Sequence, residues 1–282
     1  MTHSAKRIFA QRIIKIFGVS KILMKLNSVA VETFFSDLSR QRIDELRNLM
    51  PLSIGKELKL KRYGSAADGG YLLKDDILKT DICISLGVGN DYSFDLDLSS
   101  ECKEVLMFDH TINDPLITKS NIKFERIGIS DVISKDFTTI DEILKQLPDE
   151  SDLILKIDVE GSEWKVLSNL SQTSLLRFRQ IIAEFHNLHR IADDKLFSDI
   201  RSALKKLNKS HELINIHVNN WSDFQIIEGI PMPDVVEVLY LRRDSSSSKN
   251  SRITTLNYLG DMPNNPDLSD YSLSFVSFFK IS

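Results

Sequence analysis

Short apolar runs of six or seven residues alternate with longer polar segments along most of the chain. Such runs predict strands that are buried on both faces, because a strand with one solvated face would alternate apolar and polar residues. We predict strands at Asp81–Leu86, Glu104–Asp109, Lys123–Ile129, Asp152–Asp158, Arg179–Phe185, Glu212–Val218 and Val235–Leu241. Helical spacing of apolar residues predicts helices at Tyr92–Ser100, Thr139–Lys145, Ser162–Leu170 and Lys195–Leu207.

The order of these elements predicts an α/β fold with a parallel sheet that is covered on both faces. No strong helical pattern separates the last two predicted strands, which indicates an antiparallel ending to the sheet. In an open parallel sheet, ligands bind at the carboxyl ends of the strands. Functional residues are therefore expected directly after the apolar runs.

Both ends of the chain depart from this pattern. Residues 1–29 contain six basic side chains and no acidic one, with apolar residues at near-helical spacing. They predict a basic amphipathic helix that either lies on an anionic membrane surface or packs on its own domain or a second subunit. A second helix is expected at Glu32–Leu49. We expect a helical extension (1–50), a main domain (51–244), and a mobile loop and tail (245–282). The last region comprises the serine-rich loop Ser245–Ser251, the Pro/Asn/Asp-rich stretch Asp261–Asp270 and a docking segment at Tyr271–Phe279.

The composition narrows the classes of function. The chain is 42% hydrophobic and 27% charged with a formal net charge of −4, so nucleic acid is not expected as a partner. No apolar run approaches the roughly 18 residues of a membrane span. Cys83 and Cys102 lack the spacing of a metal site or a disulfide framework. We expect a cytoplasmic protein. It would contact the inner membrane surface peripherally if the basic helix binds lipid, and would be a homo-oligomer if that helix packs on a second copy.

A nucleotide-binding pattern follows the first two strands. Gly87 and Gly89 come after the first strand, and Asp109 ends the second about 20 residues later. Glycine allows the backbone to approach a ligand closely, and an acid at this spacing typically binds two ribose hydroxyls. Asp91 stands where a pyrophosphate-binding loop would have its third glycine. An acid repels a diphosphate but suits a cation, which favours S-adenosylmethionine over a nicotinamide cofactor.

The stretch KIDVEGSEW resembles the FkbM-type methyltransferases, a class I family that uses S-adenosylmethionine. Further stretches occur in the family's order, over about Leu58–Arg243: RYGSAADGGYLL, SLGVGNDYSFD, TIDEIL, AEFH, and HVNNW followed by PDVVEVLYLRR. The resemblance implies a three-layer sandwich with a seven-stranded, mostly parallel sheet whose last strand is antiparallel, beside the N-terminal helical extension. It also implies O-methylation of a hydroxyl of a sugar, in a surface glycan or its nucleotide-linked precursor.

The donor site has one departure from the wider class. Ser85 stands where many class I methyltransferases have an acid, so the amino group of the cofactor needs another partner. Asp91, or Asp68 in the loop before the first strand, is expected to take that role. Asp131, after Ser130, is expected either to bind the adenine amino group or to cap a turn.

Other strand ends carry groups that suit methyl transfer. A methyl group on a sulfonium is already activated, so the protein must align the acceptor and remove its hydroxyl proton. His186 is a candidate base, with Glu184 on the same side of its strand and Asp158 at the mouth of the central strand. Alternatively, His186 is a structural residue bonded to a carbonyl, and His189 is the substitute base. Asp158, Glu184 and His186 are also a candidate site for a divalent cation such as Mg²⁺.

A further set of residues is expected to bind the acceptor. Amides bond sugar hydroxyls and an aromatic ring stacks on the apolar face of a sugar. Each candidate also has a structural interpretation, in turn capping, core packing or surface charge. The candidates are Arg62, Tyr71, Glu160, His189, His217, Asn219, Asn220 and Trp221, whereas Glu163 and Trp164 are expected to be structural.

Two other classes of function remain open at this point. A nicotinamide-dependent oxidoreductase would use a similar sheet, although the absent third glycine and Asp91 count against it. A non-catalytic adaptor would keep the fold and dock through its basic N-terminal helix.

Overall fold

A computed structural model describes residues 37–52, residues 58–243 except positions 80, 116, 150 and 223, and residues 261–271. The predicted N-terminal basic helix, the loop Ser245–Ser251 and the segment after Tyr271 lie outside the described residues. Within the described part of the chain, no helix is long and apolar enough to cross a bilayer.

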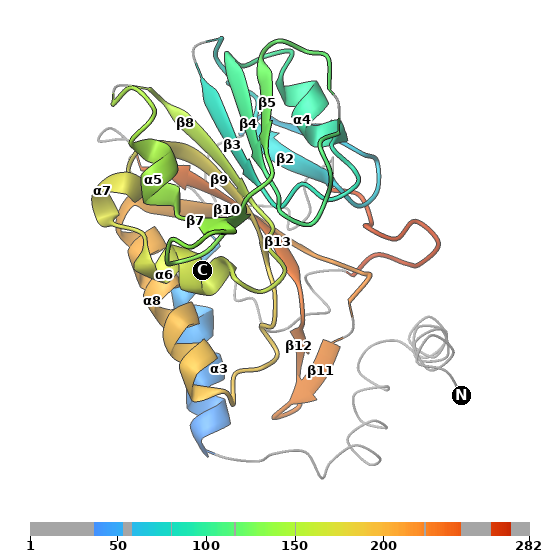
Figure 1. The fold of residues 1–282 in the computed structure, drawn as a ribbon. Coiled ribbons are helices and arrows are strands. Elements are labelled where there is room, and N and C mark those ends of the chain that lie inside the picture. The colour runs from blue at the N-terminus through green and yellow to red at the C-terminus, as the bar shows by residue number, and fades with distance from the viewer. Residues whose placement is uncertain are drawn as a thin grey trace.

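One sheet of seven strands organises the protein (Figure 1). Its strands are β3 (Ile82–Leu86), β4 (Glu104–Phe108), β5 (Ile122–Glu125), β8 (Leu153–Ile157), β9 (Phe178–Phe185), β10 (His211–Val218) and β13 (Val236–Arg242). They are arranged in the order β10-β13-β9-β8-β3-β4-β5. β13 is antiparallel to both neighbours and the other neighbours pair in parallel. The class I sheet with a reversed last strand is thus confirmed.

The central strands are apolar because both of their faces are covered. β3 and β8 are buried along their whole length. One face packs against helices α3 (Asp37–Leu49), α5 (Ile140–Leu144), α6 (Glu163–Asn169), α7 (Gln172–Leu175) and α8 (Asp194–Ser210). The other face packs against α4 (Ser93–Leu98) and the hairpin of β1 (Leu60–Gly64) and β2 (Gly70–Lys74). The hairpin, which the sequence pattern did not predict, shares the second layer with α4.

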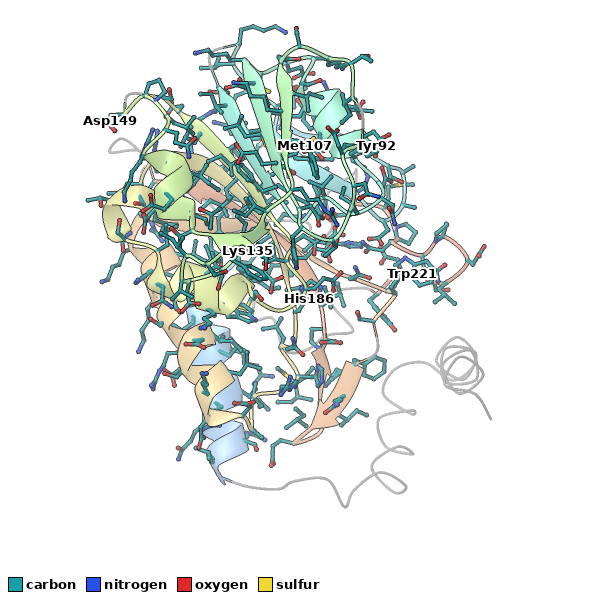
Figure 2. The ribbon with its side chains drawn as sticks, in the orientation of Figure 1. Tyr92, Met107, Lys135, Asp149, His186 and Trp221 are labelled. Carbon is teal, nitrogen blue, oxygen red and sulfur yellow. The ribbon has the colours of Figure 1, made fainter. Side chains whose placement is uncertain are left out.

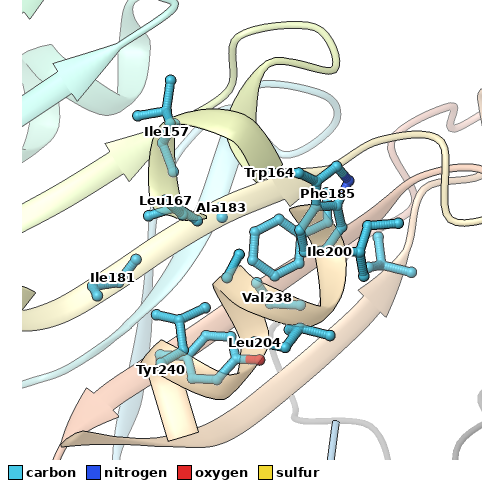
Figure 3. Close-up of a cluster of buried hydrophobic side chains, with 14 of the residues drawn as sticks. Ile157, Trp164, Leu167, Ile181, Ala183, Phe185, Ile200, Leu204, Val238 and Tyr240 are labelled. Carbon is cyan, nitrogen blue, oxygen red and sulfur yellow. The ribbon is translucent and has the colours of Figure 1, made fainter. Parts of the chain in front are cut away.

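Helices α6 and α8 bury aromatic and aliphatic side chains on β9 and β13 (Figure 3). The ring of Trp164 lies 4.1 Å from that of Phe185, between centroids. Trp164 Nε1 also donates to the carbonyl of His186 at 2.7 Å. The expected packing role of Trp164 is confirmed, and this packing anchors the backbone directly after β9.

One predicted strand is wrong in its length. The run Lys123–Ile129 was expected to be a single strand, but β5 ends at Glu125, where the Ile127 amide bonds the Glu125 carbonyl at 2.9 Å in a tight turn. Gly128 and Ile129 form a separate short strand, β6, which pairs in parallel with β7 (Phe137–Thr138). Ser130 therefore follows β6 rather than the third strand of the sheet.

Between β10 and β13 the chain forms a hairpin and not a helix. Its strands are β11 (Phe224–Ile227) and β12 (Ile230–Pro233), joined by Glu228 and Gly229, which both have positive φ (53° and 73°). The C-terminal segment, Asp261–Tyr271, returns to the sheet (red loop in Figure 1), where Asp261 accepts a hydrogen bond from Asn215 of β10 at 3.1 Å.

Candidate active site

The loop after β3 lies directly against the end of β8. Gly87 has φ of +73°, and a Cβ at this position would lie 1.6 Å from the carbonyl oxygen of Asp158. The Gly87 amide donates to the Phe108 carbonyl at 3.0 Å, and the Asp158 amide donates to the Leu86 carbonyl at 2.9 Å. Only glycine fits this position, so the loop backbone and Asp158 share one small region.

Asp109 organises this loop from the end of β4. Its Oδ2 accepts from the amides of Val88 and Gly89, both at 2.9 Å. Its Oδ1 accepts from the amide of Thr111 at 2.7 Å and from the Thr111 hydroxyl at 2.6 Å. Burial alone would raise the pKa of Asp109, but these hydrogen bonds outweigh it and lower the pKa below its ordinary value. The expected contact between Asp109 and a ribose stays a prediction.

The turn between β1 and β2 carries Asp68 and lies against Asp91, a residue of the loop after β3. A Cβ on Gly69 would lie 3.0 Å from Oδ2 of Asp91, so the turn and the loop are in contact. Oδ1 of Asp91 accepts from the Ser93 amide at 2.9 Å. Burial raises the pKa of Asp68, whose Oδ1 accepts from the Asn264 amide group at 3.1 Å. Asp68 and Asp91, far apart in the sequence, thus converge at the expected donor site.

Arg62 supports the same turn. Its Nε donates to the carbonyl of Ser65 and its guanidinium NH2 group donates to the carbonyl of Ala67, both at 2.8 Å. These bonds explain why the turn is fixed over the loop, and they give Arg62 a structural task besides its expected role in acceptor binding.

Ser130 and Asp131 lie beside a groove of about 680 Å³ along α5, α6 and α7. The Ser130 hydroxyl donates to Asp131 Oδ1 at 3.2 Å, and Lys165 Nζ lies 2.8 Å from the same oxygen. The Lys165 ammonium group holds the pKa of Asp131 below its usual range. Asp158 and Glu184 do not line this groove, so the groove is separate from the carboxylates at the ends of β8 and β9.

Three carboxylates and one histidine lie in a row across the sheet, toward the carboxyl ends of β8 and β9. Asp158 follows β8, Glu184 is paired in register with Glu237 between β9 and β13, and Glu237 is paired with His217 of β10. The Tyr71 hydroxyl donates to Glu184 Oε1 at 3.1 Å and lies 3.4 Å from Asp158 Oδ2. Oδ1 of Asp158 is buried and makes no hydrogen bond among the described residues. We refer to Asp158, Glu184, Glu237 and His217 as the acidic row.

Burial and neighbouring negative charges both raise pKa values in this row. Burial raises the pKa of Glu184 well above its ordinary value, and the negative charges of Asp158, Glu237 and Asp68 raise it further. Burial and the same acids also raise the pKa of Tyr71. Glu184 therefore binds a proton more tightly than an ordinary carboxylate does.

His186 is enclosed by acids. Its Nδ1 lies 3.1 Å from Glu163 Oε1, and its Nε2 lies 3.4 Å from Glu160 Oε2 and 3.9 Å from Glu184 Oε2. Burial alone would lower the pKa of His186, but its hydrogen bond to Glu163 and the surrounding negative charge raise it to about 9. His186 and Glu184 lie on the same side, as the strand pleat predicted. At neutral pH the imidazole is protonated, so it must lose this proton before it can act as a base.

Glu163 has a larger role than the sequence pattern indicated. Besides bonding His186, its Oε1 accepts from the amides of Val159 at 2.9 Å and Gly161 at 3.0 Å. Glu163 is fully buried at the first turn of α6, so it holds the exit turn of β8 and the His186 ring together.

Lys156 is a site residue that the sequence analysis did not single out. Its side chain is buried, its Nζ donates to the Gly87 carbonyl, and it lies 3.5 Å from Asp158 Oδ2. The same Nζ lies 5.5 Å from the centroid of the Tyr71 ring. The signal in the sequence was a lysine inside an otherwise apolar run. Burial of this charge is unfavourable unless a charged or polar partner lies beside it.

The loop after β10 uses its amides locally. Asn219 Oδ1 accepts from the Trp221 amide at 2.9 Å. Asn220 is bonded twice to the backbone of Asn265, through its Nδ2 at 3.0 Å and its Oδ1 at 2.6 Å. The Trp221 side chain is half exposed at the rim. His186 and Trp221 follow strands with the same direction and lie toward the same end of the sheet (Figure 2).

Two other acceptor candidates, Glu160 and His189, lie near the exits of β8 and β9. Glu160 has a positive φ of 53° and an exposed side chain. Asn187, next to His186, has a φ of 63°. His189 Nδ1 lies 3.0 Å from Asp234 Oδ1, so His189 is paired with an acid outside the acidic row. Left-handed backbone at residues other than glycine is unfavourable and clusters at functional sites, which fits the position of Glu160 and Asn187.

We expect the protein to lose stability as pH rises from 6.5 to about 9, in part through His186. The folded protein raises the pKa of this group from 6.5 to about 9, so the stabilisation is complete below pH 6.5 and is lost as pH rises through about 9. The effect is on the order of 3 kcal/mol. Urea unfolding across this range should show a shallower loss for His186→Gln than for the wild type.

His211→Gln is a matched control for this measurement. Burial lowers the pKa of His211 to about 4, so its contribution to stability appears as pH rises from 4 to 6.5. The control should keep the loss between pH 6.5 and 9. Equal losses in the wild type and His186→Gln would contradict the assignment.

Residues 72–211 match the family model of the Methyltransferase FkbM domain. The chain belongs to the FkbM methyltransferase family. It is an S-adenosylmethionine-dependent methyltransferase, and the match sets aside the oxidoreductase alternative. The match contains Gly87, Asp109, Asp158, Glu184 and His186, whereas Asp68, Tyr71, Glu237 and His217 lie outside it. No curated protein matches the sequence.

Several solved structures resemble this FkbM methyltransferase. A Streptococcus mutans protein assigned as a methyltransferase, in complex with SAH, is 13% identical, and the alignment covers 74% of this chain and 100% of that one with a TM-score of 0.31. A Listeria monocytogenes protein assigned as an S-adenosylmethionine-dependent methyltransferase is 11% identical, with coverages of 72% and 98% and a TM-score of 0.36. An rRNA methylase from Streptococcus thermophilus is 10% identical, with coverages of 75% and 100% and a TM-score of 0.32.

The donor side of the FkbM methyltransferase fits S-adenosylmethionine. A diphosphate would meet the carboxylate of Asp91 beside Gly69, whereas a ligand with a cationic amino group would be attracted to it. The buried, unbonded Oδ1 of Asp158 also suits a positively charged neighbour. On these grounds the residues fit a nucleoside ligand with a cationic end.

Proposed function

We propose that this FkbM methyltransferase transfers a methyl group to a hydroxyl of a sugar, in a surface glycan or its nucleotide-linked precursor. The observation that carries the proposal is Glu184, a buried carboxylate of raised pKa that lies between Tyr71 and His186 at the carboxyl edge of the sheet. A carboxylate with a raised pKa is a better proton acceptor near neutral pH than an ordinary one. Hydroxyl methylation needs such a group.

The donor would be held by the loop after β3 and by the acids around it. The backbone at Gly87 and Gly89 would approach the nucleoside, Asp109 would bind the ribose, and Asp131 with Ser130 would bind the adenine. Asp91 would attract the amino group. When bound, S-adenosylmethionine supplies a methyl group that is already activated by a sulfonium.

The residues of the protein then have to manage the proton and the acceptor. Glu184 accepts the hydroxyl proton, and the Tyr71 hydroxyl, which bonds Glu184, fixes the orientation of its carboxylate. Asp158, at the end of the central strand, orients the acceptor. His186, protonated at neutral pH, offsets the charge of the three surrounding glutamates. Trp221 at the rim offers a stacking surface for the apolar face of a sugar.

A divalent cation would fit the same group. Asp158, Glu184 and His186 each offer one ligand atom, and these atoms lie within 4.8 Å of one another. Two carboxylates and an imidazole suit Mg²⁺ less well than Mn²⁺, because imidazole is a ligand of softer metals. Binding would require neutral His186 and would release its proton, so we expect metal-dependent proton release.

The test is methyl transfer to a panel of sugars and sugar nucleotides, measured by mass spectrometry. The purified protein is incubated with S-adenosylmethionine after chelation, and Mg²⁺ or Mn²⁺ is restored in separate reactions. A methyl increment on a hydroxyl supports the proposal, and activity that returns only with metal supports the cation site. A methyl group on an amine would overturn the hydroxyl assignment, and full activity after chelation would overturn the proposed cation site.

A further inference from the structure

The C-terminal segment Asp261–Tyr271 lies outside the matched family domain, yet it is bonded to the acidic row. Oδ1 of Asp270 lies 3.1 Å from Nε2 of His217, and the backbone of Asn265 is bonded to Asn220. His217 also lies 3.3 Å from Glu237, so it stands between two acids. Desolvation would lower the pKa of His217, but these two acids raise it to about 10, and the segment is held by an ion pair at neutral pH.

Asn264 makes the closest contact of this segment with the site. Its side chain is almost completely buried. Its Nδ2 donates both to Glu237 Oε1 and to Asp68 Oδ1, the latter at 3.1 Å. The backbone carbonyl of Asn264 also accepts from the Asp68 amide at 3.1 Å. One neutral amide therefore holds a carboxylate from β13 and another from the β1–β2 turn.

These two carboxylates are positioned next to Glu184. Oxygen atoms of Asp68, Glu184 and Glu237 lie within 4.8 Å of one another. Like charges at this distance repel, and the burial of Glu184 and Glu237 increases the repulsion, so a donor that satisfies two of the carboxylates stabilises the arrangement. Asn264 supplies this donor. Its removal would free Asp68 and Glu237 to turn away from Glu184.

Two exposed apolar side chains belong to this segment and to the loop tied to it. Trp221 is 52% exposed and Met262, in the same segment as Asn264, is 39% exposed. The Asn220–Asn265 bonds tie the Trp221 loop to the segment. Oriented carboxylates in the site and an exposed aromatic ring on a loop tied to the same segment suit a ligand that has both hydroxyls and an apolar face.

We infer that Asn264 is a positioning residue for the acceptor: it fixes Asp68 and Glu237 so that their free oxygen lone pairs bind neighbouring hydroxyls of the acceptor. The C-terminal segment is thus the wall that selects the acceptor, and the matched domain supplies the donor site and Glu184. This inference rests on the proposed methyl transfer to a hydroxylated acceptor.

The test compares Asn264→Ala with Asn265→Ala. The side chain of Asn265 is a matched control, because among the described residues it bonds only the Asp267 amide, within the segment itself. The wild type is first assayed with the panel of sugars, sugar nucleotides and amines, and the acceptor that it methylates is used for both variants. Thermal melting and S-adenosylmethionine binding are measured alongside.

Asn264→Ala should raise the acceptor KM by about 10- to 100-fold, the range expected for hydrogen bonds to charged groups. It should also reduce the preference among sugars that differ in one hydroxyl, and Asn264→Gln should restore part of that preference. Asn265→Ala should stay within about twofold of the wild type.

An unchanged acceptor KM and preference in a folded Asn264→Ala would overturn the inference while the proposed function stands. Equal losses in both alanine variants would overturn it as well, since they would show a role in folding the segment. If the wild type methylates an amine, the proposed hydroxyl assignment fails and the comparison still decides the role of Asn264. No turnover with any acceptor would overturn both.

Discussion

Asp158→Asn should lower kcat by about 10²-fold, because Asp158 orients the acceptor and a small misplacement of a reactant costs about this much. Asp158 is where the two halves of the site meet: Gly87 lies against its carbonyl, and Lys156 Nζ and the Tyr71 hydroxyl lie 3.5 Å and 3.4 Å from its Oδ2. Asparagine keeps the shape but removes the charge. Steady-state kinetics with saturating donor would measure the effect.

Asp152→Asn is the control at the opposite end of the same strand. Asp152 directly precedes β8 and its Oδ1 accepts from Arg242 at 2.9 Å, far from the carboxyl edge. This exposed ion pair contributes little, so its loss should leave kcat within about twofold. If Asp158→Asn kept kcat within about threefold of the wild type, the placement of the reaction at the end of β8 would be wrong.

Gly87→Ala should destabilise the protein by about 3–5 kcal/mol and abolish donor binding. The new methyl group would lie 1.6 Å from the Asp158 carbonyl, which is backbone held in the sheet, and φ of +73° is unfavourable for alanine. Relief of the clash would separate the ends of β3 and β8. Urea unfolding and S-adenosylmethionine titration would measure the two effects.

Gly89→Ala is the control, because it introduces the unfavourable backbone conformation of alanine without the steric clash expected at Gly87. Gly89 has a similar φ of +64°, but a Cβ there would meet no atom within 4 Å. The strain alone costs roughly 1–2 kcal/mol. Equal losses of stability in the two variants would mean that the contact between Gly87 and Asp158 is not what restricts this position.

Much of the fold followed from the sequence because strands covered on both faces must be apolar. The runs that became β3, β8 and β9 were recognisable for this reason, and the polar residues after them marked the carboxyl edge of the sheet. Pleat alternation placed Glu184 and His186 on one side, and their side chains lie 3.9 Å apart. The β1–β2 and β11–β12 hairpins were missed because their strands are short and their partners are fixed by contacts outside the local pattern.

The sequence by itself determined the family and the order of most strands of the large sheet, and it marked the strand ends at which the candidate site residues lie, since burial and turn geometry impose residue types locally. Only the tertiary structure decided which charges meet. It placed Asp68 and Asn264, 196 positions apart, in one hydrogen bond, enclosed His186 among three glutamates, and set Lys156 beside Asp158. The physical reason is that proton affinity and ion pairing depend on distance and burial in space, and neither can be read from positions along a chain.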